Sequence, residues 1–207
     1  MGGDSSSVAE LLMTGVVQIV ATDTALAAIK DNGSVVTWGA WNHGGDSTAV
    51  ATLLAEGVAQ VCGNTGAFAA RKSNGSVVTW GDTFSSGISS LIAPLLAKDV
   101  VQICATSVNA FAAIKANGSV VTWGDDEVGG DSSKADGSVV TWGCDDYGAD
   151  QSAVATLLSG VVQICGGEMS FAAIKADGSV VSWGDSRYGG DSSAVASLLT
   201  QGVVAIC

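Results

Sequence analysis

The chain has 207 residues, of which 47% are hydrophobic and 14% charged, so it can bury a core and is not a disordered polymer. Twenty acidic against eight basic residues give a net charge of −12, which repels a phosphate backbone and argues against nucleic acid as a partner. Apolar runs stay far below the roughly eighteen residues that span a bilayer, so no transmembrane segment is expected.

Three strand-like segments open the chain and are followed by a short helical one. VVQIV at 16–20, ALAAIK at 25–30 and SVVTWG at 34–39 are rich in residues that favour strands. Between the second and third lies Asn32-Gly33, a dipeptide that favours a two-residue hairpin turn. A Gly- and Asp-rich loop comes next, and DSTAVATLL at 46–54 predicts a short helix with Asp or Ser at its start. Each unit therefore reads β-β-β-α.

This pattern returns with a period of about 42 residues, marked by tryptophans at 38, 80, 123 and 183. A further Trp142 belongs to a duplication, because residues 134–152 repeat residues 115–133 with thirteen of nineteen positions identical. We predict one repeat domain over residues 1–207, with units at 4–39, 46–81, 86–124 and 150–184, an inserted half unit at 134–152 and a partial terminal unit at 191–207. The half unit is expected to add an edge strand or a protruding hairpin, and a merely tolerated duplication explains it equally well.

The order V-x-Q-I-C, A-F-A-A-I-K-A-D-G-S-V-V-T-W-G and a Gly-containing loop resembles the repeat of the regulator of chromosome condensation family. The resemblance implies an all-β propeller, usually of seven blades, and the short unit is similar to the bacterial β-lactamase-inhibitor members. Four units do not make a seven-bladed ring from this chain alone. An open arc, a smaller ring, completion by another chain, or a β-solenoid are the alternatives.

Two departures from the family pattern bear on activity. The family's usual His at the start of the second strand is replaced at four positions, and the Gly-Gln-Leu-Gly loop is replaced by GGDSS. The four positions are Ala25, Ala67, Ala110 and Ser170. Exchange-factor activity is therefore carried over to no residue of this chain.

Charge should separate along the units. If the three strands are antiparallel, the Asn/Asp-Gly turns lie at one pole and the loops after each Trp at the other. The turn pole carries Lys30, Lys72, Lys115, Lys134 and Lys175. The opposite pole carries Asp4, Asp46, Asp82, Asp125, Asp126, Glu127, Asp131, Asp145, Asp146, Asp150, Asp185 and Asp191. We expect that second face to be strongly negative.

Candidate chemistry is sparse. His43 is the single histidine, so a Ser–His or Cys–His pair has little support, and a surface loop position is expected for it. Cys62, Cys104, Cys165 and Cys207 recur at the end of the first strand, where a small apolar side chain packs, and no C-x-x-C pair suggests zinc. The odd number of cysteines favours free thiols and a reducing intracellular compartment. Calcium-loop and nucleotide-loop spacings are absent, so we expect no metal, no cofactor and no enzyme.

Recognition by a surface remains. Aromatic residues stand beside charges in the loops after Trp, a combination that suits protein binding. The predicted protein-binding residues are Trp41, His43, Asp125, Asp126, Glu127, Asp145, Asp146, Tyr147, Asp185, Arg187 and Tyr188. We expect a non-catalytic interaction or scaffold module, such as a peripheral subunit of a larger complex, whose protein partner has a basic or mixed-charge surface. The alternative is a regulator of an enzyme, either an exchange factor for a small GTPase or a protein inhibitor.

Overall fold

The computed structural model describes residues 3–86, 92–124 and 155–206, and the predicted three-strand units form four antiparallel sheets. The first sheet contains β1 (Val16–Ala21), β2 (Ala25–Lys30) and β3 (Val35–Gly39), and the second β4 (Val58–Gly63), β5 (Ala67–Lys72) and β6 (Val77–Gly81). The third contains β7 (Val100–Ala105), β8 (Ala110–Lys115) and β9 (Val120–Gly124), and the fourth β10 (Val161–Gly166), β11 (Ser170–Lys175) and β12 (Val180–Gly184).

Helices in the described residues are short, between three and six residues long, and they precede, connect or follow these sheets. They are η1 (Ser6–Val8), α1 (Ala9–Leu12), η2 (Trp41–His43), η3 (Thr48–Val50), α2 (Ala51–Leu54), α3 (Thr83–Ser86), η5 (Ala155–Leu157), η6 (Ser186–Tyr188) and η7 (Ser193–Leu198). Leu54 of α2 faces inward as predicted, and Leu96 and Leu158, which lie outside these helices, are also no more than 2% exposed. Other helix leucines are exposed: Leu11 at 55%, Leu53 at 48%, Leu157 at 49% and Leu198 at 76%. Among the described residues, no helix has the length and apolarity that a membrane crossing requires.

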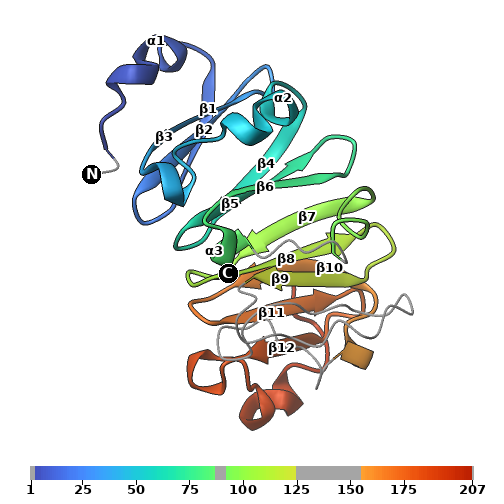
Figure 1. Cartoon of the computed structure of the whole chain (residues 1–207). Helices are drawn as coiled ribbons and strands as arrows, with labels where there is room; N and C mark the ends of the chain where they lie inside the picture. Colours follow the sequence, from blue (N-terminus) through green and yellow to red (C-terminus); the bar gives the residue numbers. More distant parts are fainter. Residues whose placement is uncertain (1–2, 87–91, 125–154, 207) are drawn as a thin grey trace.

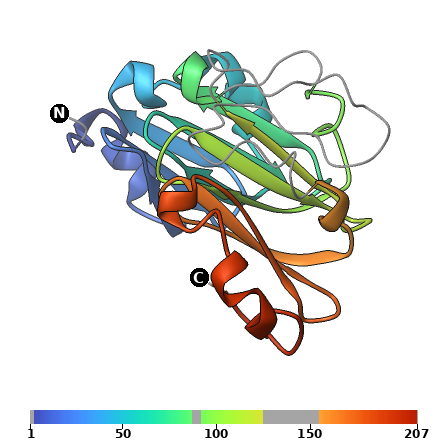
Figure 2. The same ribbon diagram turned by 90° about the horizontal axis from the view of Figure 1, so that it is seen from below.

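The four sheets stack in chain order, with the first (blue) and fourth (orange) at opposite ends of the series (Figures 1 and 2). The first strands of successive sheets, β1, β4, β7 and β10, contact one another. Each sheet thus has a neighbouring sheet against one or both of its faces. In consequence β8 is buried along nearly its whole length, whereas the sequence predicted only partial burial for this segment.

The sheets interlock through two different faces, which we call the aromatic face and the alanine face. In β5, Phe68 stacks on Trp80 of β6, with ring centroids 5.2 Å apart, and the pair packs against Ala25 and Ala27 of the first sheet. Ala67 and Ala69, the alternate residues of β5, point the other way and form the alanine face, which packs against the third sheet. The aromatic pair recurs as Phe111–Trp123 and Phe171–Trp183, each with centroids 5.4 Å apart. These pairs lie at the next two interfaces between neighbouring sheets, which we call joints.

Backbone bonds fix the direction of the hairpin between the second and third strands in each of the four described sheets. Val58 N–H, at the start of β4, donates to Gly33 O in the hairpin turn of the first sheet at 2.9 Å. The same bond joins Val100 to Gly75, Val161 to Gly118 and Val203 to Gly178, at 3.0, 3.1 and 3.1 Å. All four hairpins therefore lie at the same end of their sheets. Each turn glycine has a positive φ, +76° at Gly33, which a two-residue hairpin requires.

Glutamine side chains also connect neighbouring sheets. Gln60 Nε2 donates to Ile103 O at 2.7 Å, and Ile103 N–H donates to Gln60 Oε1 at 3.1 Å. Gln102 Nε2 donates to Ile164 O at 3.0 Å, which repeats the first of these bonds one joint further along. The predicted propeller-like repeat array is thus confirmed within the described residues, where strands pair only inside their own sheet. The predicted half unit at 134–152 lies outside those residues.

Candidate functional site

Loops that follow the third strand give the predicted binding residues a common geometry. After β3, Ala40 is extended, η2 makes one turn, and Gly44 ends it with a φ of +95°. After β12, Asp185 and η6 follow the same path, and Gly189 has a φ of +94°. His43 and Tyr188, five residues after their tryptophans, therefore occupy the same structural position, as the alignment predicts.

The first of these loops is anchored to the turn between β1 and β2. His43 Nδ1 lies 2.9 Å from Thr24 Oγ1, and Thr22 Oγ1 donates to His43 O at 3.2 Å. Trp41 lies beside them with 77% of its surface exposed. The loop thus presents an indole and an imidazole on a fixed backbone, which suits recognition of another molecule.

The second loop carries a charge pair. Asp185 is 8% exposed, and its carboxylate accepts bonds from Arg187 N–H at 2.8 Å and from Arg187 Nη2 at 2.5 Å. Hydrogen bonds from Arg187 lower the pKa of Asp185 below its ordinary value. Arg187 itself is mostly exposed, and its guanidinium carbon lies 5.9 Å from the centre of the Tyr188 ring. Asp185 therefore orders this loop instead of offering a free negative charge.

Other carboxylates that the sequence assigns to the negative pole also accept hydrogen bonds that stabilise the local backbone. Asp46 Oδ1 accepts from Thr48 N–H at 2.9 Å and from Thr48 Oγ1 at 2.7 Å, and these bonds lower the pKa of Asp46. Asp4 and Asp191 accept from the N–H groups two residues on in the same way. The aspartate thus makes an Asx turn ahead of the helix, and no serine at an N-cap accepts a side-chain bond in η1, η3 or η7.

Asp46 also lies beside the middle of β3 and not beyond its end. Thr37 Oγ1 donates to Gly45 O at 3.1 Å and lies 2.9 Å from Ser47 Oγ, so the returning chain runs along the outer strand. Asp46 therefore lies along the outer side of the first sheet.

Lysines at the hairpin end have a defined role as well. Lys30 Nζ donates to Leu11 O at 2.5 Å, and Lys72 Nζ donates to Leu53 O at 2.7 Å. Both acceptors lie in single-turn helices, whose last carbonyls have no partner within the helix. In the first two sheets the lysine of the second strand therefore anchors the preceding helix.

A polar network between adjacent loops was missed by the sequence analysis. Asn64 is 4% exposed; its Oδ1 accepts from Ala67 N–H at 2.9 Å and its Nδ2 donates to Ser85 O at 3.0 Å. Thr65 Oγ1 donates to Ser107 O of the next sheet at 2.9 Å. A polar residue after the first strand recurs at Thr22, Asn64 and Thr106, and this recurrence was the available signal. These bonds hold neighbouring loops in register.

Six of the predicted binding residues lie outside the described residues: Asp125, Asp126, Glu127, Asp145, Asp146 and Tyr147. The structure therefore brings together two loop sets, Trp41 with His43 and Asp185 with Arg187 and Tyr188, at opposite ends of the series of sheets. Their role in binding stays a prediction.

Within the described ranges, no group of three His, Cys, Asp or Glu side chains could hold a metal ion. Cys62 and Cys104 have free thiols, and burial raises the pKa of both.

Comparisons with known proteins give information on the fold alone. No protein-family model and no curated protein matches the sequence. Among solved structures, human WBSCR16 is similar with a TM-score of 0.51 and 18% identity over 82% of this chain and 47% of that one. Prp20p from Saccharomyces cerevisiae, described with its binding to Gsp1p and histones, has a TM-score of 0.49 and 19% identity over 82% and 43%. Yeast RCC1 (Prp20) bound to Kap60 has 0.49 and 20% identity over 82% and 42%.

The chain thus spans less than half the length of these three proteins. The fold is a propeller-like repeat array, shared with WBSCR16 at low identity, and it agrees with the all-β propeller that the sequence resemblance implies.

Proposed function

We propose that this chain is a non-catalytic protein-interaction module that binds partners through the loops after its third strands. The observation that carries the proposal is the pair of ordered loops with exposed aromatic side chains, Trp41 at 77% and Tyr188 at 41% exposure. Aromatic groups with few rotatable bonds give contact area at low entropic cost and are enriched at interface hot spots.

The partner that fits is a protein with a basic or mixed-charge surface. The net charge of −12 favours approach of a basic surface, and the exposed aspartates Asp46 and Asp191 keep their charge because hydrogen bonds lower their pKa values. Arg187 adds a positive group beside Tyr188, which suits a mixed-charge contact. The six residues outside the described part, from Asp125 to Tyr147, belong to the same proposal, as does a place as a peripheral subunit.

The experiment is selection of peptides on the immobilised chain from a displayed library with basic, neutral and acidic members. Peptides rich in Lys or Arg should be enriched, and raising the salt concentration should weaken them. Trp41→Ala with Tyr188→Ala should lose their binding, whereas Met13→Ala, a control residue with 78% exposure away from these loops, should keep it. Enrichment of acidic peptides, or equal binding by the loop variant, would contradict the proposal.

Regulation of an enzyme is the second candidate and rests on the resemblance of the repeats. It would take the form of an exchange factor for a small GTPase or of an inhibitor like the short-bladed bacterial members. Nucleotide-release and β-lactamase inhibition assays with the purified chain test the two forms, and no effect in either assay would remove this candidate.

A further inference from the structure

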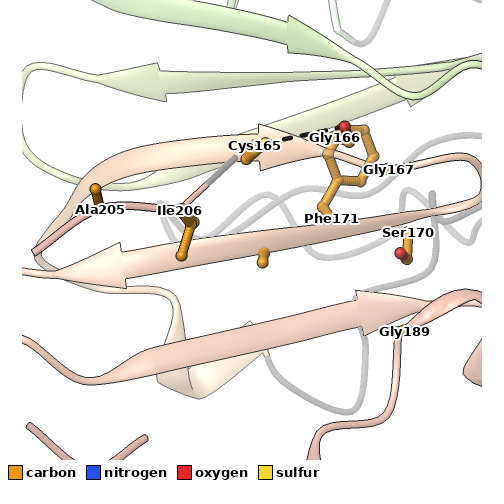
Figure 3. Close-up of a pocket in the computed structure, with 9 residues that line it drawn as sticks. Cys165, Gly166, Gly167, Ser170, Phe171, Gly189, Ala205 and Ile206 are labelled. Carbon is orange, nitrogen blue, oxygen red and sulfur yellow. Dashed lines mark hydrogen bonds between the residues drawn. The ribbon is translucent and has the colours of Figure 1, made fainter. Parts of the chain in front are cut away.

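The alanine face of the fourth sheet holds a cavity that the other joints fill with a phenylalanine ring. Ala27, Ala69 and Ala112 are 0% exposed in their joints, but the equivalent Ala172 is partly exposed. A cavity of about 440 Å³ opens there, between Cys165, Ser170, Ala172, Gly189 and Ile206 (Figure 3).

The glycines after η2 and η6 show what is missing. A Cβ atom built on Gly44 would lie 2.5 Å from Phe68 Cδ2, so the ring of the next sheet lies directly against that glycine. The equivalent Gly189 has only Ser170 Oγ within 4 Å, at 3.6 Å. Trp80 Nε1 also donates to Gly44 O at 3.0 Å. The cavity therefore lies where, at the other joints, the aromatic face of the next sheet packs.

The first sheet has the complementary exposed surface. Ile19 of β1 is 55% exposed, whereas its equivalents Val61, Ile103 and Ile164 are 4%, 1% and 3% exposed against the preceding sheet. Leu26 pairs with Trp38 where the other sheets pair Phe with Trp. The same residues that form three internal joints are thus uncovered at both ends of the series.

A segment of the chain itself partly covers the alanine face of the fourth sheet. Residues 191–206 repeat residues 4–19 with eleven of sixteen positions identical. Val203 N–H donates to Gly178 O at 3.1 Å and Gln163 Nε2 donates to Ile206 O at 3.0 Å, which are the bonds that a first strand makes at the other joints. No β2-like strand pairs with Val203–Ile206 among the described residues, and Val204 is 92% exposed.

We propose that the alanine face of the fourth sheet is a docking site for the first sheet of a second copy of this chain, and that the segment 191–206 competes with residues 4–19 of that copy for it. On association, β1 of the second copy replaces Val203–Ile206, its Ile19 carbonyl accepts from Gln163, and its Leu26 enters the cavity. This joint continues an interface that the chain already contains three times. The segment 191–206 thereby holds the chain in its unassociated form.

The test is the oligomeric state of full-chain variants by sedimentation over a series of protein concentrations. Ile206→Asp should weaken the hold of the segment and promote head-to-tail association, with the association constant raised about tenfold or more over wild type. Val204→Asp, on the exposed side of the same segment, should behave like wild type.

Adding Ile19→Asp to Ile206→Asp should return the chain to monomer, whereas adding Val17→Asp, at 63% exposure on the other side of β1, should not. Leu26→Phe in the Ile206→Asp chain should tighten association by filling the cavity as Phe68 does in the first joint. Circular dichroism of every variant separates loss of fold from loss of association. A monomeric Ile206→Asp chain that retains its fold, or association that survives Ile19→Asp, would overturn the proposal.

Discussion

Replacing Gln60 with Leu should destabilise the joint between the second and third sheets. Gln60 exchanges two hydrogen bonds with the backbone of Ile103, a residue that is 1% exposed. Leu keeps the approximate volume but leaves a buried N–H and a buried carbonyl without these partners. A net contribution of about 1 kcal/mol per bond, together with the cost of an unpaired buried group, predicts a loss of about 2–3 kcal/mol.

Urea unfolding followed by circular dichroism measures this loss, and the repeat supplies matched controls. Gln102→Leu removes one bond, to Ile164 O, and should cost about 1 kcal/mol. Gln18→Leu, at an exposed position, should change the free energy of unfolding by less than about 0.5 kcal/mol. Equal effects of all three substitutions would refute the idea that the two-bond geometry sets the magnitude.

Three other predictions concern single residues. Asp99 has a φ of +63°, where its equivalent Gly57 has +71°, so Asp99→Gly should raise the free energy of unfolding by about 1 kcal/mol in the same urea assay, and a decrease would show that the carboxylate matters more than the backbone. Bonds from Arg187 lower the pKa of Asp185, so they contribute to the free energy of unfolding above about pH 4, and this contribution is lost as pH falls through the lowered pKa. NMR titration should give Asp185 a midpoint below that of an ordinary aspartate. Arg187→Ala should raise that midpoint. Burial raises the pKa of Cys62, so its alkylation at neutral pH should be slow in the folded chain and fast in urea, and rapid native labelling would contradict the buried environment.

The strands and hairpins could be predicted because their signals are local. Asn32-Gly33 fixes a turn whatever surrounds it, and the Val- and Trp-rich run before Gly39 has few other uses. Burial of both faces of the second strand was not visible, since two alanines and a Phe fit a half-buried strand as well as a fully buried one. Which of these holds depends on the neighbouring sheet.

The candidate site was less accessible to sequence reasoning. Pairing of Asp185 with Arg187 depends on a turn that brings residues two apart into contact, so a carboxylate counted as free charge proved to be neutralised. The role of Lys30 was hidden for a similar reason, because its acceptor lies nineteen residues away in another element. Composition gives the number of charges, and only the packing of elements decides which of them stay available.

Loop identity and fold stability should be separable in this array. The loops at 40–44 and 185–189 have nearly the same backbone, with φ of −63° and ψ of 121° at their first residues and φ of +95° and +94° at the closing glycines. Their side chains differ at all four positions between those ends, from Ala40 to His43 and from Asp185 to Tyr188. Since the joints between sheets use other residues, replacing residues 40–43 by the sequence Asp-Ser-Arg-Tyr should change the free energy of unfolding by less than about 1 kcal/mol. The same exchange should remove binding that requires Trp41 and transfer to the first sheet any binding that requires the Arg–Tyr pair, measured with the selected peptides. Loss of fold on this exchange would show that these side chains support the contacts between sheets. The sequence of these loops could then not change without affecting the stability of the array.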